Sequence, residues 1–254
     1  MSVTVNGKKR TFIMHVPSDY KGDKAVPLVV DYHQIGQDGK YQMNNSTYKA
    51  LTDKEGVISL YPDGTAKSLG GMGMGKGWNV GPCCSDDNDI KFSRMMIDSV
   101  EKLVCIDKRR VYAMGFSIGG GMANHVACFM SDVFAAVAPA AQDLNVTNSA
   151  QCNPDRPISV ISFRGKNDNV YKYDGGESGF HDGLNFLGAE KNFEFWAQKN
   201  ECEGTPSKNS DDCSEYSRCK DGVKVVLCTK QKGGGHEQGD ARIGWPFLKQ
   251  FMLP

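Results

Sequence analysis

The sequence lacks any long hydrophobic run and any excess of charge of one sign. No stretch of its 254 residues approaches the roughly 20 consecutive apolar residues needed to cross a bilayer, so we expect no contact with a membrane. Lysine plus arginine total 30, as do aspartate plus glutamate, so no global field favours nucleic acid or an acidic membrane surface. A neutral or weakly charged ligand fits this composition better.

The N-terminus also lacks the apolar core of a signal peptide, because residues 1–15 alternate polar and apolar side chains. Nine cysteines are nevertheless many for a cytosolic protein of this size, and their spacings give no convincing zinc-binding pattern. We therefore expect disulfides, no bound metal, and a secreted protein in its mature form, with Met1 as an added start. A cytosolic protein is the alternative.

Short β-branched runs alternate with longer helical patterns along the chain, without an internal repeat or a low-complexity block. This alternation is typical of an α/β fold with a mostly parallel central sheet and helices on both faces. We expect one domain over residues 1–254, with a polar, cysteine-rich excursion at about 200–222 that forms either a lid or a remote surface loop. The predicted strands cover residues 3–5, 11–16, 27–32, 57–61, 110–114, 135–138, 158–163 and 223–229, and the predicted helices cover 89–103, 120–130, 189–199 and 241–251.

A Gly-x-Ser-x-Gly pattern lies between a predicted strand and a predicted helix, at residues 115–119. Such a nucleophile elbow lifts a serine hydroxyl clear of the sheet, and its glycines relieve crowding in the sharp turn. A glycine-rich turn without chemistry is the alternative, and the flanking strand and helix make it less favoured. Ser117 is therefore the candidate nucleophile.

A serine hydroxyl needs a base to accept its proton, and histidine suits that role near neutral pH. His236 lies in a glycine-rich loop directly after the last predicted strand. His33 is the rival, but it precedes the serine and so breaks the expected order of serine, acid and histidine. We expect His33 to shape its own loop instead. We expect His125, eight residues past the serine on a predicted helix, to pack or to face solvent. His15 and His181 have no supporting context.

The base in turn needs a carboxylate that holds the imidazole in one tautomer and stabilises it once protonated. Asp168 follows the next-to-last predicted strand, where the chain order favours the acid. Asp143, after an earlier strand, and Asp174, slightly later, are the alternatives. The predicted catalytic set is Ser117, Asp168 and His236.

The tetrahedral intermediate of acyl transfer needs backbone N–H donors, each worth roughly 3 to 4 kcal/mol. We expect one donor from Ile118, directly after the serine. The second should come from the loop after the 27–32 strand, with Ile35 as first choice and Gln34 as second. Trp78 and Gln34 are also candidates for the substrate pocket, although Trp78 could equally pack beneath a loop.

Several blocks of the sequence, in one order, are far more specific than any single motif. In these blocks the chain resembles the fungal feruloyl esterases of carbohydrate esterase family one and their relatives the polyhydroxybutyrate depolymerases, which have the α/β-hydrolase fold. The resemblance implies an extracellular serine esterase without a cofactor, and it assigns the same three catalytic residues. The blocks are residues 61–64, 77–84, 105–119, 131–139, 168–176 and 233–236.

The chain departs from that family in two places. Gln34 stands where many relatives have the glycine of a His-Gly pair, and residues 237–238 are Glu-Gln where Trp-Pro is common. These changes bear on the acyl pocket and the second oxyanion donor. The family's cysteine positions imply the pairs Cys128–Cys152 and Cys202–Cys219, and they leave open Cys83, Cys84, Cys105, Cys213 and Cys228.

The resemblance implies a monomeric feruloyl esterase that removes hydroxycinnamates from feruloylated plant cell-wall arabinoxylan. An acetylxylan esterase or a polyhydroxybutyrate-depolymerase-like esterase is the alternative within the same chemistry, because acyl preference depends on pocket shape. A noncatalytic polysaccharide-binding domain that kept the fold is an alternative of another class. The complete serine, aspartate and histidine set argues against that last reading.

Overall fold

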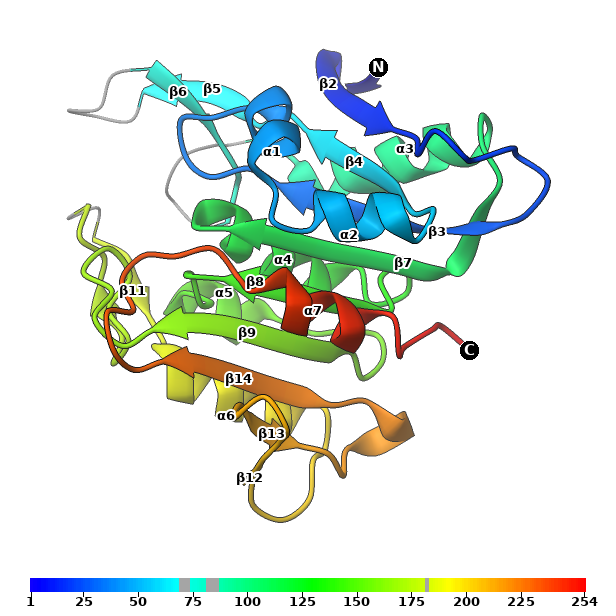
Figure 1. Cartoon of the computed structure of the whole chain (residues 1–254). Helices are drawn as coiled ribbons and strands as arrows, with labels where there is room; N and C mark the ends of the chain where they lie inside the picture. Colours follow the sequence, from blue (N-terminus) through cyan, green and yellow to red (C-terminus); the bar gives the residue numbers. More distant parts are fainter. Residues whose placement is uncertain (69–73, 81–86, 181–182) are drawn as a thin grey trace.

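The computed structural model describes residues 1–68, 74–80, 87–180 and 183–254 of the chain (Figure 1). Its centre is a ten-stranded sheet in the order β1-β2-β4-β3-β7-β8-β9-β14-β13-β12. The strands from β4 to β14 in this order run parallel, and the outer strands on both sides pair antiparallel. They are β1 (Ser2–Val5), β2 (Lys8–His15), β3 (Val26–Tyr32), β4 (Ile58–Pro62), β7 (Ile106–Phe116), β8 (Ala136–Ala140), β9 (Ser159–Gly165), β12 (Ser207–Lys208), β13 (Ser214–Tyr216) and β14 (Val225–Lys230).

Helices cover both faces of this sheet, which confirms the predicted α/β fold. Figure 1 shows α1, α2 and α7 in front of the sheet and α3, α4, α5 and α6 behind it. The helices are α1 (Gly39–Asn45), α2 (Lys49–Lys54), α3 (Asp89–Glu101), α4 (Ile118–Phe129), α5 (Val146–Gln151), α6 (Ala189–Lys199) and α7 (Ala241–Leu248), with a 3-10 turn at Lys220–Gly222.

The two faces of the sheet carry two separate cores. Along β3, Leu28 and Val30 pack on the face covered by α4, whereas Val29 packs on the other face in the same core as Trp245 of α7. Because both faces are buried, this strand has an apolar side chain at nearly every position. The predicted continuous apolar run over residues 27–32 is explained in this way.

The structure also contains elements that the sequence patterns did not predict. These include α1, α2, α5, the strands β12 and β13 of the excursion, the hairpin of β5 (Thr65–Ser68) with β6 (Met74–Gly77), and the hairpin of β10 (Gly176–Glu177) with β11 (Asn185–Phe186). The predicted closing helix is too long, because α7 ends at Leu248. Beyond α7, the Leu253 N–H donates to the carbonyl of Arg109 in β7, and this bond holds the end of the chain against the sheet. In the part of the chain that the structure describes, no helix is long and apolar enough to cross a membrane.

The cysteine-rich excursion lies at one edge of the central sheet. Its strand β13 pairs with β14, and the disulfide Cys213–Cys228 joins these two strands. The disulfides implied by the family resemblance, Cys128–Cys152 and Cys202–Cys219, are both present. Cys105 is an exposed free thiol, and Cys83 and Cys84 lie outside the described residues.

Candidate active site

The candidate nucleophile stands at a sharp turn between β7 and α4. Ser117 is buried and has φ +58° and ψ −127°, a conformation that a residue with a side chain rarely adopts. Two backbone bonds hold it there: the Ser117 N–H donates to the Ala140 carbonyl (3.0 Å), and the Gly121 N–H donates to the Ser117 carbonyl (3.1 Å). The local geometry is therefore that of a nucleophile elbow.

The two glycines of the motif are required by close backbone contacts. A Cβ atom on Gly115 would overlap the backbone of Gly119, and a Cβ atom on Gly119 would overlap the Tyr32 carbonyl at the end of β3. The first turn of α4 therefore packs directly on the neighbouring strand. This packing fixes the serine relative to the loop that follows β3.

The structure brings the candidate base and acid together. His236 Nδ1 lies 2.9 Å from Asp168 Oδ2, and the Val170 and Tyr171 N–H groups donate to Asp168 Oδ1 at 2.8 and 3.0 Å. Burial raises the pKa of Asp168, but the hydrogen bonds from His236 and these N–H groups outweigh it and hold the pKa below its ordinary value. The carboxylate is thus kept charged beside the imidazole.

The loops that carry these two residues are tied to each other. The Asn167 N–H donates to the Gly234 carbonyl at 2.7 Å, and the Lys166 N–H donates to the Lys230 carbonyl at 3.0 Å. A Cβ atom on Gly165 would overlap the backbone of residues 234–235, so the end of β9 lies in close contact with the histidine loop. These contacts explain why residues 68 positions apart share one hydrogen bond.

The imidazole also lies against the nucleophile's neighbour. The His236 and Phe116 ring centroids are 4.9 Å apart, and Phe116 directly precedes Ser117. The His236 side chain is 20% exposed whereas that of Asp168 is 0% exposed, so the acid is sealed behind the base. Among the described residues, the Ser117 hydroxyl makes no hydrogen bond to the imidazole. Such bonds are often long before substrate binds.

The rival histidines have other surroundings. His33 is fully buried; its Nε2 accepts the Gly64 N–H (2.9 Å) and its Nδ1 faces the Gln34 carbonyl (2.7 Å), and burial lowers its pKa to about 4. These contacts fit the predicted structural role in its loop. Burial also lowers the pKa of His125 to about 4, and His15 pairs with Asp53 at 2.6 Å. His181 lies outside the described residues.

The rival carboxylates are also engaged elsewhere. Asp143 forms a buried ion pair with Arg164. Asp174 is 89% exposed and lies 3.4 Å from the Lys166 ammonium group. Neither contact involves the imidazole of His236, which leaves Asp168 as the carboxylate bonded to it.

The loop after β3 offers donors for an oxyanion. Within it, the Gly36 N–H donates to the Lys76 carbonyl (2.8 Å) and the Gln37 N–H donates to the Gln34 carbonyl (3.3 Å). Among the described residues, the N–H groups of Gln34 and Ile35 have no such acceptor. Ile118 is the first residue of α4, where backbone N–H groups are not used within the helix. Both predicted choices for the second donor therefore stay open.

Of the two roles left open for Trp78, packing beneath a loop agrees with the structure. Trp78 is fully buried, its indole N–H donates to the His33 carbonyl at 2.9 Å, and its ring contacts those of Tyr32 and His33. A side chain with no exposed surface cannot contact an acyl group. Trp78 supports the loop after β3 from beneath, and Gln34, which is partly exposed, remains a candidate pocket residue.

An aromatic cluster beside the imidazole was missed by the sequence reasoning. Tyr171 contacts His236 (ring centroids 5.7 Å apart), Phe180 (6.1 Å) and Phe186 (4.8 Å). Tyr171 and Phe186 are buried, whereas Phe116 and Phe180 are partly exposed. The sequence does contain a series of aromatic residues between positions 171 and 186, but no strand or helix pattern placed them near the candidate site.

A separate cavity of about 780 Å³ lies on the α7 side of the histidine loop. Asp211 and Asp212 of the excursion line it together with Glu237 and Gln238, while Ser117 and His236 do not. The excursion therefore borders the histidine loop, and its role as a lid stays a prediction. In the described ranges, no group of three or more histidine, cysteine, aspartate or glutamate side chains could hold a metal ion.

Comparison with known proteins finds esterases among those similar to this chain. Feruloyl esterase B of Piromyces equi is 44% identical over 252 residues, which are 96% of this chain and 46% of that protein. Over nearly its whole length, this chain is similar in sequence to that feruloyl esterase. The bifunctional acetylxylan esterase/xylanase of Neocallimastix patriciarum is 28% identical over 97% of this chain and 34% of its own length. The chain spans less than half the length of both relatives.

Solved structures with the same arrangement of elements give the fold of this chain. The acetyl xylan esterase from Aspergillus awamori superposes with a TM-score of 0.69 over 98% of both chains, at 16% identity. An S-formylglutathione hydrolase from Agrobacterium tumefaciens superposes with a TM-score of 0.62 at 14% identity. The fold is therefore that of the α/β-hydrolases, as predicted. No family model matches the sequence.

Proposed function

We propose that this chain is a serine esterase that hydrolyses feruloyl esters of plant cell-wall arabinoxylan. The observation that carries the proposal is the hydrogen bond between His236 and Asp168, with the imidazole lying against the residue that precedes Ser117. The relationship to Feruloyl esterase B supports the acyl group. The disulfides fit an oxidising compartment, and we propose a secreted, monomeric enzyme.

The proposed reaction forms an acyl-enzyme on Ser117. His236 accepts the hydroxyl proton as the oxygen attacks the ester carbonyl, and Asp168 stabilises the resulting imidazolium. Backbone N–H groups of Ile118 and of Ile35 or Gln34 stabilise the oxyanion. The imidazolium then protonates the departing sugar oxygen, and water attacks the acyl-enzyme by the same steps. No cofactor takes part in the proposed reaction.

The aromatic cluster favours an aromatic acyl group. Phe116 is partly exposed and contacts His236. Phe180 is also partly exposed and contacts the buried Tyr171, which itself contacts His236 and the buried Phe186. A planar hydroxycinnamoyl ring bound at Ser117 would contact such rings edge-on or stacked. We therefore propose the partly exposed Phe116 and Phe180, together with Gln34, as part of the acyl pocket.

Acetyl ester hydrolysis is the second candidate, because one curated relative is named for acetylxylan esterase activity. Initial rates on methyl ferulate and on acetylated xylan distinguish the two. We expect turnover of methyl ferulate that Ser117→Ala abolishes while the circular dichroism spectrum stays unchanged. Negligible turnover of methyl ferulate with clear release of acetate would refute the feruloyl assignment, and an active Ser117→Ala variant would refute the nucleophile.

A further inference from the structure

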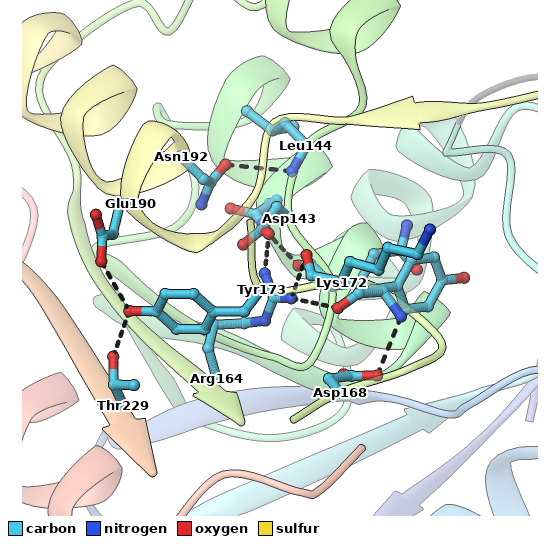
Figure 2. Close-up of polar contacts among 12 residues, drawn as sticks. Asp143, Leu144, Arg164, Asp168, Lys172, Tyr173, Glu190, Asn192 and Thr229 are labelled. Atoms are coloured by element: carbon cyan, nitrogen blue, oxygen red, sulfur yellow. Dashed lines mark hydrogen bonds and ion pairs between the residues drawn. The ribbon is translucent and has the colours of Figure 1, made fainter. Parts of the chain in front are cut away.

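A buried ion pair lies directly behind the candidate acid. Figure 2 shows Arg164, the next-to-last residue of β9, between Asp143 and the backbone of the segment that follows Asp168. The Arg164 and Asp143 side chains are 1% and 2% exposed. Burying two charges costs free energy that their attraction only partly recovers, so a stabilising role alone is a weak explanation for such a pair.

The guanidinium group of Arg164 holds the backbone of the acid loop. Its Nη2 donates to the Tyr171 carbonyl at 2.6 Å and lies 3.4 Å from the Lys172 carbonyl. The N–H of the same Tyr171 donates to Asp168 Oδ1 at 3.0 Å. Arg164 and Asp168 therefore bind the two backbone groups of one residue, whose ring also contacts His236.

The segment that carries Asp143 is itself fixed. The Leu144 N–H donates to Asn192 Oδ1 of α6 at 3.2 Å, and the Leu144 carbonyl accepts the Leu187 N–H at 3.0 Å (Figure 2). Ala141, two residues before Asp143, has φ +68°, which is strained for a residue with a Cβ atom. Such strain persists only where the surrounding contacts determine the backbone.

The charge of Arg164 persists at neutral pH. Burial lowers its pKa to about 10, which leaves the guanidinium protonated. Its planar group presents several N–H donors in fixed directions, so it can bind a carboxylate and a carbonyl oxygen at once. A shorter or neutral side chain could not do both.

We propose that Arg164, held by Asp143, is a positioning residue that sets the Asp168 carboxylate against His236. The proposal rests on the proposed triad and adds the residues that hold its acid in place. No described contact joins Arg164 to Ser117 or His236, so Arg164 acts on the site through the Tyr171 backbone. Because a displacement of about 1 Å in a catalytic group can cost about 100-fold in rate, this support matters for catalysis.

Arg164→Lys tests the proposal with the smallest change of charge. Lysine keeps a positive charge opposite Asp143 but lacks the fork that also reaches the backbone carbonyl. We expect kcat for a small aryl acetate to fall about 10- to 100-fold, with KM changed less than about three-fold. Asp143→Asn should give a similar loss. Asn192→Ala, the mildest variant, should give a smaller loss, and it carries the test if the other two fail to fold.

The same substitutions made in an Asp168→Asn variant distinguish an effect on the position of Asp168 from a general loss of stability. If Arg164 acts through Asp168, Arg164→Lys should cost less than about three-fold there, because the group it positions is already lost. The full loss in that background would overturn the proposal, as would an unchanged kcat in the single variants. If Asp168→Asn alone leaves kcat unchanged, the triad fails instead, so the two failures are distinguishable.

Arg156→Lys is the matched control. Arg156 also donates to two backbone carbonyls, those of Pro157 and Phe134. It precedes the first residue of β9, whereas Arg164 lies near the last residue of that strand. We expect this variant to unfold at a lower temperature with kcat unchanged. An equal loss of kcat in Arg156→Lys would show that any arginine bonded to backbone carbonyls has this effect, and would overturn the specific role of Arg164.

Discussion

Two carboxylates follow neighbouring parallel strands of this sheet and have different partners. Asp168, after β9, is bonded to the imidazole of His236 and to two backbone N–H groups. Asp143, after β8, is paired with the guanidinium of Arg164. An aspartate at the carboxyl end of a strand is therefore not sufficient to identify an acid. The partner decides whether the carboxylate can serve a reaction.

The largest expected effect is the loss of kcat on substitution of Asp168. Asp168→Asn keeps the shape of the side chain but removes the charge that stabilises the imidazolium and selects its tautomer. We expect kcat to fall about 10⁴-fold, against about 100-fold or less for Asp143→Asn. Steady-state kinetics on an aryl ester measure both. Equal losses in the two variants would contradict the distinction.

The second prediction concerns stability. Here the larger loss is expected when the partner of Asp143 is removed, and the smaller loss when the partner of Asp168 is removed. Arg164→Met leaves Asp143 buried without a cation and should lower the free energy of unfolding by about 3 to 5 kcal/mol. His236→Ala leaves Asp168 its two backbone donors and should cost about 1 kcal/mol. Urea unfolding measures both. The double variant Arg164→Met with Asp143→Leu should recover most of the loss, and its failure to do so would argue against the ion pair as the cause.

The third prediction concerns the pH dependence of stability, in which the buried imidazole of His33 differs from both carboxylates. The folded pKa of His33 is about 4, below its ordinary value of 6.5, so the unfolded chain binds more protons between these values. Stability is therefore lost as the pH falls from 6.5 toward 4, by about 2 kcal/mol at pH 5 for this group. The pKa of Asp168 is also lowered, so its contribution is lost only at still lower pH.

Urea unfolding at pH 7, 6 and 5 checks this assignment. Asp31 opposes the trend, because burial raises its pKa to about 6 and the folded state then binds the extra proton. Comparison with His33→Gln isolates the histidine, since Asp31 is present in both proteins. The variant should be less stable at pH 7 but lose about 2 kcal/mol less on going to pH 5. Identical pH dependence in the two proteins would remove His33 as the cause.

The smallest expected effect concerns Asp174, the third aspartate considered as the acid. Asp174 is 89% exposed and its contact with Lys166 is long, at 3.4 Å. Exposed ion pairs contribute little, so Asp174→Asn should leave the free energy of unfolding within about 0.5 kcal/mol. It should also leave kcat within about two-fold, since Asp174 has no contact with His236. A large loss of activity would mean that the acid has been assigned to the wrong aspartate.

Much of the fold could be predicted because its signals are local. The apolar runs of the central strands, the periodicity of α3 and α6, and the glycines of residues 115–119 each depend on a few adjacent side chains. The β5–β6 hairpin was missed because residues 65–77 are rich in glycine and lack alternation. The helices α1 and α2 are short and carry few buried apolar side chains.

The parts of the site that could not be predicted depend on contacts between distant segments. Asp168 was preferred by chain order, yet nothing near Asp143 in the sequence indicates that its partner is Arg164. The sequence allowed Trp78 either a place in the pocket or packing beneath a loop, and only the packed structure shows that its indole N–H donates to the His33 carbonyl. The pairing of Cys213 with Cys228 could not be derived from spacing either.

The central claim is that Ser117 is the nucleophile activated by His236 and Asp168. Its most direct test is to treat the protein with an aryl phosphonate ester and map the adduct by peptide mass spectrometry. We expect one adduct, on Ser117, whose formation abolishes ester hydrolysis and is strongly slowed in His236→Ala. An adduct on another residue, or full hydrolysis with Ser117 modified, would contradict it.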